Sequence, residues 1–152
     1  MAGGRLQGVD VRSAAPSDAA DIAGLLGEVG QVVTARTIVT RLERMSRDSA
    51  ILVATGFAPV IGVVALHWSR GVTSDAARAW VDVLAVGGQD RGRGIGRLLL
   101  KSASQLARTA GCDTLEIVAE DGGVGFLVAT GFARSGQVLC RPLRRRSGAA
   151  PE

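Results

Sequence analysis

The sequence has no tyrosine, and its other aromatic residues are three phenylalanines and two tryptophans among 152 residues. Proteins that bind single-stranded nucleic acid use aromatic side chains as stacking platforms within a basic groove. The chain carries a net charge of +4, but it has few residues for such stacking, so we expect no nucleic-acid partner. Because 47% of the residues are hydrophobic, we expect a folded chain whose core is filled by aliphatic side chains.

Cysteine and histidine are also scarce, with Cys112 and Cys140 as the only thiols and His67 as the only imidazole. The two cysteines do not form a close metal-ligand pair, so we expect free thiols and no metal. The N-terminal residues lack the hydrophobic stretch of a secretory signal. The longest apolar run, residues 60–68, is much shorter than the roughly 20 residues that cross a bilayer. We therefore expect a cytoplasmic protein with no membrane partner.

Hydrophobic periodicity divides the chain into alternating helices and strands. Helical spacing is found in three segments, at residues 16–30, 34–48 and 95–111, and residues 123–132 form a short apolar helix or turn. Strands are predicted at residues 9–14, 50–55, 60–68, 78–86, 114–120 and 137–143. This mixture predicts an α/β or α+β fold with a mixed sheet. We expect one domain over residues 9–143, a flexible arm over residues 1–8 and a disordered basic tail over residues 144–152.

The most unusual stretch is AVGGQDRGRGIGRLLL, residues 85–100, which holds five glycines and three arginines between a predicted strand and a predicted helix. A helix N-terminus presents unpaired N–H groups and a positive dipole end. Glycines let a ligand approach the backbone closely, and arginines add charged donors. The composition therefore predicts an anion site, best suited to phosphate.

The stretch fits neither of two common phosphate motifs. The dinucleotide pattern G-x-G-x-x-G fails because Arg97 or Leu99 stands where the last glycine belongs, and the P-loop pattern fails because Leu100 precedes Lys101. The spacing instead resembles the pyrophosphate motif of the GNAT superfamily of acyl-CoA-dependent N-acyltransferases, Gln/Arg-x-x-Gly-x-Gly/Ala after a strand ending in valine. Val86 ends the strand here, and Arg91, Gly94 and Gly96 fill the three fixed positions.

A second segment, EDGGVGFLVATGF at residues 120–132, is similar to the family's next motif in part. Phe126, Gly131 and Phe132 match it, whereas Glu120 replaces the usual asparagine and Leu127 the usual tyrosine. The resemblance implies a mixed, mostly antiparallel sheet of about six or seven strands, flanked by about four helices, with a splayed strand pair at the coenzyme A site. It also implies transfer of an acetyl group from acetyl-CoA to a primary amine by direct attack. A homodimer is left open, since dimers are the commonest oligomers.

The resemblance also implies which residues hold coenzyme A. The main chain of the strand end would pair with the pantetheine amides, and the amides of the turn would bind the pyrophosphate. One strand N–H, from Val86 or its neighbour, would face the thioester oxygen. The implied binding residues are Leu84, Ala85, Val86, Arg91, Gly92, Arg93, Gly94, Ile95, Gly96 and Arg97.

Three residues are candidates for the base that takes a proton from the acceptor amine. Asp82 lies on the strand before the motif, and two-residue alternation would place it on one face with Trp80, Leu84 and Val86. Its other interpretation is an aspartate paired with an arginine such as Arg78, or one facing water. His67 is a candidate because histidine is the residue type most often used for proton transfer at neutral pH, although a lone histidine on a strand is more often structural. Glu120 occupies a family position that often contacts cofactor or water, or it simply ends its strand.

The family's tyrosine, which protonates the leaving thiolate, is Leu127 here, and no other tyrosine can replace it. A thiol with a pKa of about 8.5 leaves tolerably well without full protonation. Two hypotheses therefore stay open: an N-acetyltransferase, or an acyl-CoA-binding regulatory or interaction module with weak or no catalysis.

Overall fold

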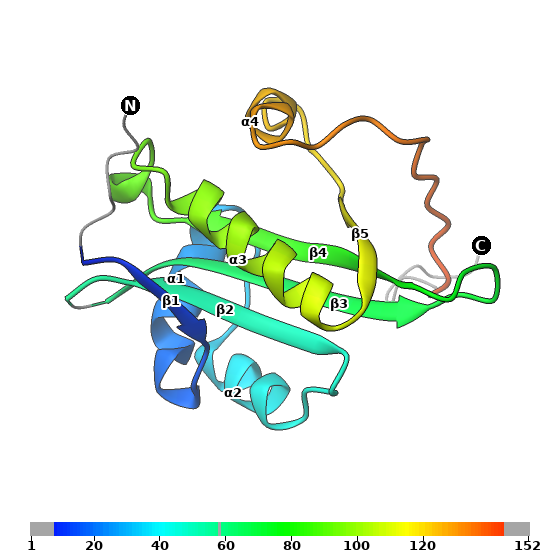
Figure 1. Cartoon of the computed structure of the whole chain (residues 1–152). Coiled ribbons are helices and arrows are strands. Elements are labelled where there is room, and N and C mark those ends of the chain that lie inside the picture. Colours follow the sequence, from blue (N-terminus) through cyan, green and yellow to red (C-terminus); the bar gives the residue numbers. More distant parts are fainter. Residues whose placement is uncertain (1–7, 58, 145–152) are drawn as a thin grey trace, which may run out of the picture. The chain divides into compact units, whose positions relative to one another are not determined.

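A computed structural model describes residues 8–57 and 59–144. The chain divides into two compact units, one ending at Ile117 and one beginning at Val118, and each is described by itself. Most of the expected arm (residues 1–7) and tail (residues 145–152) lies outside the described residues. Figure 1 shows the elements in chain order.

The first unit contains a five-stranded sheet in which the strands lie in sequence order. Its strands are β1 (Asp10–Ser13), β2 (Ser49–Thr55), β3 (Val60–Arg70), β4 (Ala77–Val86) and β5 (Cys112–Ile117). The first four strands pair antiparallel, whereas β4 and β5 pair parallel. A parallel neighbour requires a crossover connection, and a helix supplies it here. The mixed sheet confirms the α+β prediction.

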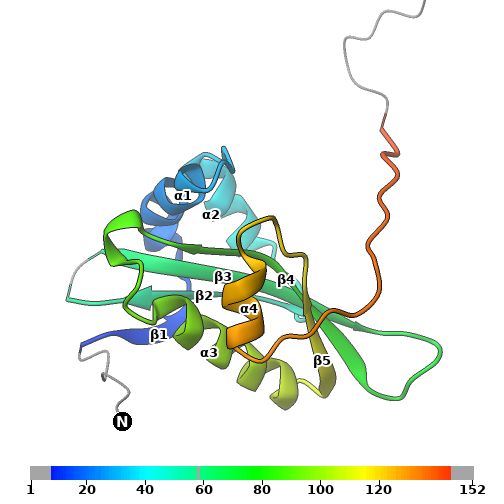
Figure 2. The same ribbon diagram turned by 90° about the horizontal axis from the view of Figure 1, so that it is seen from above.

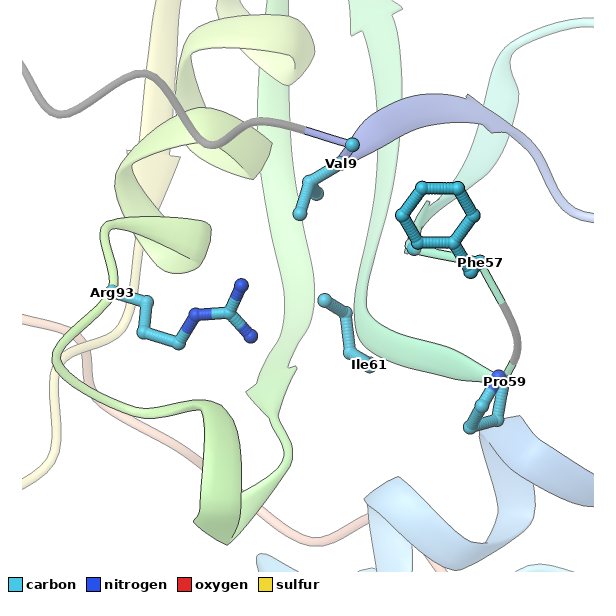
Figure 3. A pocket seen from close by; sticks show the side chains of 7 residues that line it. Val9, Phe57, Pro59, Ile61 and Arg93 are labelled. Atoms are coloured by element: carbon cyan, nitrogen blue, oxygen red, sulfur yellow. The ribbon is translucent and has the colours of Figure 1, made fainter.

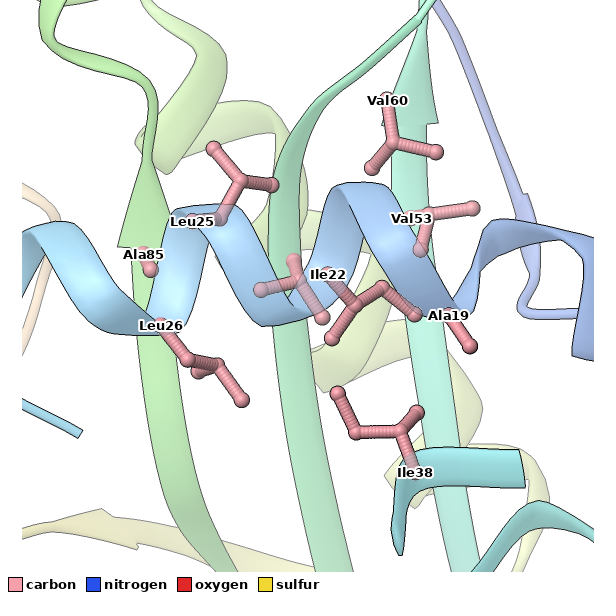
Figure 4. Close-up of a cluster of buried hydrophobic side chains, with 9 residues drawn as sticks. Ala19, Ile22, Leu25, Leu26, Ile38, Val53, Val60 and Ala85 are labelled. Atoms are coloured by element: carbon pink, nitrogen blue, oxygen red, sulfur yellow. The ribbon is translucent and has the colours of Figure 1, made fainter. Parts of the chain in front are cut away.

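Two helices, α1 (Ala19–Glu28) and α2 (Ala35–Glu43), cover one face of the sheet, as Figure 2 shows. Helix α2 begins where the Thr34 hydroxyl accepts a hydrogen bond from the Thr37 N–H. The two helices and the sheet enclose a cluster of aliphatic side chains (Figure 4): Ala19, Ile22, Leu25, Leu26, Ile38, Val53, Val60, Val63 and Ala85.

An ion pair between the exposed Arg12 and the buried Asp18 fixes the chain between β1 and α1. Arg12 donates to both carboxylate oxygens of Asp18, at 2.7 and 2.8 Å, and the Ala15 N–H donates to the same carboxylate at 2.7 Å. The hydrogen bond from Arg12 lowers the pKa of Asp18 below its ordinary value, outweighing the opposing effect of desolvation. The carboxylate therefore stays ionised where it is buried.

Helix α3 (Ile95–Thr109) covers the opposite face of the sheet. Its apolar positions recur at helical spacing, and Ile95, Leu99 and Ala103 are each at most 1% exposed. Gly62 of β3 lies directly beneath its first turns. A Cβ at this position would lie 2.9 Å from Cδ1 of Leu99 and 3.0 Å from Cγ2 of Ile95. The missing side chain thus lets the start of α3 approach the sheet closely.

The second unit contains one helix, α4 (Val124–Ala129), among its described residues. Gly131 has φ +105° and ends this helix, while the Phe132 N–H donates to the Leu127 carbonyl at 3.0 Å. This is the hydrogen-bonded helix end that glycine favours. The glycine of the second motif therefore has a local structural role.

The predicted strand at residues 137–143 is wrong: no strand forms there, and the described residues contain five strands rather than six or seven. Val138, Leu139 and Leu143 are 75, 89 and 90% exposed. An alternating pattern predicts an extended chain, but cross-strand pairs are what stabilise a strand. Pro142 also has no N–H to donate to a ladder.

We expect Gly62→Val to lower the free energy of unfolding by about 1–3 kcal/mol, because the side chain would overpack the contact between β3 and α3. Urea denaturation measures the difference. Gly71→Val is the matched control, since a Cβ there meets no atom within 4 Å. Equal stability of the two variants would contradict the close approach of α3.

Candidate functional site

A β-bulge interrupts β4 at Asp82. Leu66 of β3 lies opposite Val81 and Ala65 lies opposite Val83, so Asp82 is an extra residue with no partner of its own. A bulge of this kind bends the strand and shifts its alternation by one residue. The middle of β4 is therefore irregular just before the strand reaches the glycine–arginine stretch.

The bulge changes which side chains share a face, and it overturns the simple alternation expected from the sequence. Trp80 pairs with His67, and Asp82 reaches the same histidine. After the bulge, Val83 and Ala85 pack in the cluster under α1 and α2. Leu84 and Val86 alternate with these two residues and so lie on the α3 face. Asp82 thus shares a face with Trp80, but not with Leu84 or Val86.

Within the first unit, the edge of β4 that faces β5 is left without a paired strand beyond the bulge, and this segment is the open edge. The parallel ladder runs only as far as the pair Val81–Ile117, while β4 continues to Val86. The Gly87 N–H donates to the Ile61 carbonyl at 2.9 Å, which sets the phase of the β3–β4 ladder. Backbone groups alternate sides in such a ladder. The N–H groups of Leu84 and Val86 therefore point away from β3, toward the open edge.

A glycine-rich turn connects this edge to α3. A single 3-10 turn spans Gly88–Asp90, and the Gly88 N–H donates to the Glu28 carboxylate at the end of α1 at 3.3 Å. Gly92 and Gly94 then adopt φ values of +80° and +84°. Left-handed backbone favours glycine. The backbone conformation therefore explains why glycine stands at these two positions, which sequence spacing alone could not show.

The N-terminus of α3 lacks the usual partners of a helix start. Its N-cap is Gly94, which offers no side-chain cap, and the first turn contains no acidic residue. Helix starts ordinarily attract such groups because their N–H groups and dipole end are positive. Arg91, exposed in the turn, adds further positive charge. The site is therefore electrostatically suited to an anion from outside the chain.

Arg93 has an internal partner in the same turn. Its guanidinium donates to Asp90 at 2.7 Å, with Asp90 only 23% exposed. Figure 3 shows the side chain directed toward a pocket of about 240 Å³ beside Ile61 and Val9. Arg93 therefore stabilises the turn through its ion pair with Asp90. The sequence pattern predicted only a role in binding the ligand.

His67, Trp80 and Asp82 form a cluster on the sheet face that α1 and α2 share. Nδ1 of His67 lies 2.8 Å from Oδ1 of Asp82, and the imidazole stacks on the Trp80 ring with centroids 5.1 Å apart and planes at 21°. The His67 and Asp82 side chains are 46 and 49% exposed. Arg78, the expected partner of Asp82, forms an ion pair with Glu116 of β5 instead. Sequence spacing could not have paired His67 with Asp82.

Glu120 and Leu127 belong to the second unit, so the structure gives only their local surroundings. Glu120 is exposed, and its carbonyl accepts a hydrogen bond from the Gly123 N–H at 3.0 Å. Leu127 on α4 is 7% exposed. The structure therefore brings together two of the three candidate bases, His67 and Asp82.

No three histidine, cysteine, aspartate or glutamate side chains within residues 8–57 and 59–144 are grouped closely enough to hold a metal ion. In the same part of the chain, no helix has both the length and the hydrophobicity to cross a membrane. Both described cysteines are free, and burial raises the pKa of the Cys112 thiol, with a further contribution from Asp113.

Residues 35–132 match the model of the acetyltransferase (GNAT) family. The chain belongs to this family. The matched region begins in α2 and includes the bulge, the open edge, the turn and α4. No curated protein is similar enough in sequence to count as a match.

Solved structures show the same fold at low sequence identity. An acetyltransferase from Trypanosoma brucei superposes with a TM-score of 0.78 at 18% identity, covering 89% of this chain and 99% of the other. Glucosamine-6-phosphate N-acetyltransferase from Arabidopsis thaliana gives 0.79 at 14%, covering 90% and 99%. An aminoglycoside acetyltransferase from an uncultured soil sample, in complex with sisomicin, gives 0.76 at 17%, covering 91% and 97%.

Proposed function

We propose that this protein transfers an acetyl group from acetyl-CoA to a primary amine by direct attack within a ternary complex. The observation that carries the proposal is the open edge of β4, which leads straight into the glycine-rich start of α3. A ligand that is extended, carries amides and ends in a diphosphate would be complementary to a strand edge followed by such a helix start. Coenzyme A has that chemistry.

The residues present fit coenzyme A at two places. The N–H groups of Leu84 and Val86 would pair with the pantetheine amides in the manner of an added strand. The exposed amides at the start of α3, with Arg91, would bind the pyrophosphate. The remaining proposed binding residues complete the strand end and the turn: Ala85, Gly92, Arg93, Gly94, Ile95, Gly96 and Arg97.

The open edge would also assist the reaction itself. When an amine attacks the thioester, negative charge develops on the carbonyl oxygen, and a fixed N–H donor stabilises it. The N–H of Leu84 or Val86 would serve as this donor, and the direction of both groups toward the open edge supports the proposal. The acceptor must be neutral to attack, so a base is needed, with Asp82, His67 and Glu120 as candidates.

One residue, Leu127, favours a second candidate function. Leu127 stands where the resembled family has its acidic tyrosine, and the chain has no tyrosine at all. Loss of a positioned acid lowers a rate by about 10²–10⁴-fold. The alternative is a module that binds acyl-CoA for regulation or interaction and turns it over weakly or not at all.

Mass-spectrometric detection of free coenzyme A and acetylated product separates the two functions in the presence of acetyl-CoA and a panel of primary amines. We expect amine-dependent formation of both products. Direct detection avoids thiol reagents, which would also react with the exposed Cys140. Tight binding of acetyl-CoA without amine-dependent product would favour the module, and absence of binding would contradict both functions.

We expect Gly94→Ala to raise the Kd for coenzyme A by about tenfold or more, because an alanine disfavours the φ of +84° that shapes the turn. Titration calorimetry measures the change. Gly111→Ala is the matched control, since Gly111 has φ +93° at the opposite end of α3. Both variants should lose about 1 kcal/mol of stability. A Kd unaffected by Gly94→Ala, or affected equally by both, would contradict binding at the turn.

A further inference from the structure

In the cluster of His67, Asp82 and Trp80, two neighbours hold the imidazole in one orientation, as a proton acceptor requires. Asp82 lies on the same face as Trp80, and the bulge leaves it without a partner residue opposite it on β3. It lies one residue beyond the last pair of the β4–β5 ladder, so the cluster adjoins the beginning of the open edge. A side chain at this position is next to the strand segment that we propose for the thioester.

The close contact with Asp82 determines which nitrogen of His67 can accept a proton. A carboxylate only accepts hydrogen bonds, so the 2.8 Å contact with Asp82 requires a hydrogen on Nδ1. In the neutral imidazole the lone pair is then on Nε2. Stacking against Trp80 holds the ring plane. Because the histidine side chain is 46% exposed, the ring is held in place and still accessible to a substrate.

The charged neighbours leave this pair intact. On β2, the residue opposite His67 is Ser49, which is uncharged. On β4 and β5, Arg78 and Glu116 lie on the same face, and they pair with each other. Asp82 is therefore not neutralised by Arg78 and can stabilise a positive charge on the imidazole.

We propose that His67 is the base for the acceptor amine and that Asp82 and Trp80 are its positioning residues. This inference rests on the proposed acetyl transfer and selects one base among the three candidates. It also assigns the approach of the amine to the sheet face shared with α1 and α2, since the cluster lies there.

Nε2 of His67 takes one proton from the acceptor ammonium, and the freed amine lone pair forms a C–N bond to the thioester carbon. The carbonyl π electrons move to oxygen and then return as the C–S bond breaks, so coenzyme A leaves with the sulfur electron pair. The second nitrogen proton passes to the thiolate or to water, and His67 releases its proton to solvent.

Steady-state kinetics of three single variants and one double variant test the assignment. We expect His67→Ala and His67→Gln to lower kcat by about 10²-fold or more with an unchanged Kd for acetyl-CoA. The pH dependence of kcat should differ between the wild type and both variants, because a general base acts only in its unprotonated form. Glu43→Gln, which removes an exposed carboxylate at the end of α2, is the control and should stay within about twofold of wild type.

Chemical rescue distinguishes a base from a structural residue. Free imidazole should restore turnover to His67→Ala but not to the double variant His67→Ala/Asp82→Asn, which lacks the carboxylate that orients the added ring. If the wild type turns over while both His67 variants keep its rate and its pH dependence, His67 is not the base, and acetyl transfer itself still stands. If acetyl-CoA binds and no amine is acetylated, the proposed function fails and the assignment of the base fails with it.

Discussion

The rest of the site depends on one constraint, which is that the β4–β5 ladder ends before β4 does. A parallel ladder that continued to Val86 would satisfy the N–H groups of Leu84 and Val86 inside the sheet, and no edge would remain for a ligand. The ladder ends at Val81 instead, and the bulge follows at the next residue. Strand edges readily accept added strands. Here the edge is short and leads directly into a helix start that attracts anions.

The same bulge links the binding edge to the proposed base. Without the extra residue, strict alternation would continue along β4, and Asp82 would take part in an ordinary cross-strand pair. The bulge instead leaves Asp82 beside His67, while Val83 and Ala85 return to the core under α1 and α2. The bulge and the end of the β4–β5 ladder thus lie at neighbouring residues, beside the carboxylate–imidazole contact. Such bulges are common next to active sites.

The sequence predicted the glycine-rich turn, α3 and the fold class because their signals are local: glycine, arginine and helical periodicity lie within sixteen residues. It misplaced Leu84 and Val86 relative to Asp82, since alternation counts residues and does not register a bulge. It could not join His67 to Asp82, because that contact depends on the register between β3 and β4. It also predicted a strand over residues 137–143, where the extended pattern has no cross-strand partner among the described residues.

Residue-resolved amide hydrogen exchange, followed by NMR with and without acetyl-CoA, tests the open edge most directly. The account predicts that the amides of Leu84 and Val86 exchange faster than that of Ala85 in the ligand-free protein, because only Ala85 points toward β3. Saturation with acetyl-CoA should slow both by about tenfold or more and leave Ala85 unchanged. Equal protection of all three amides before ligand is added, or no slowing at saturation, would contradict an open edge that binds acetyl-CoA.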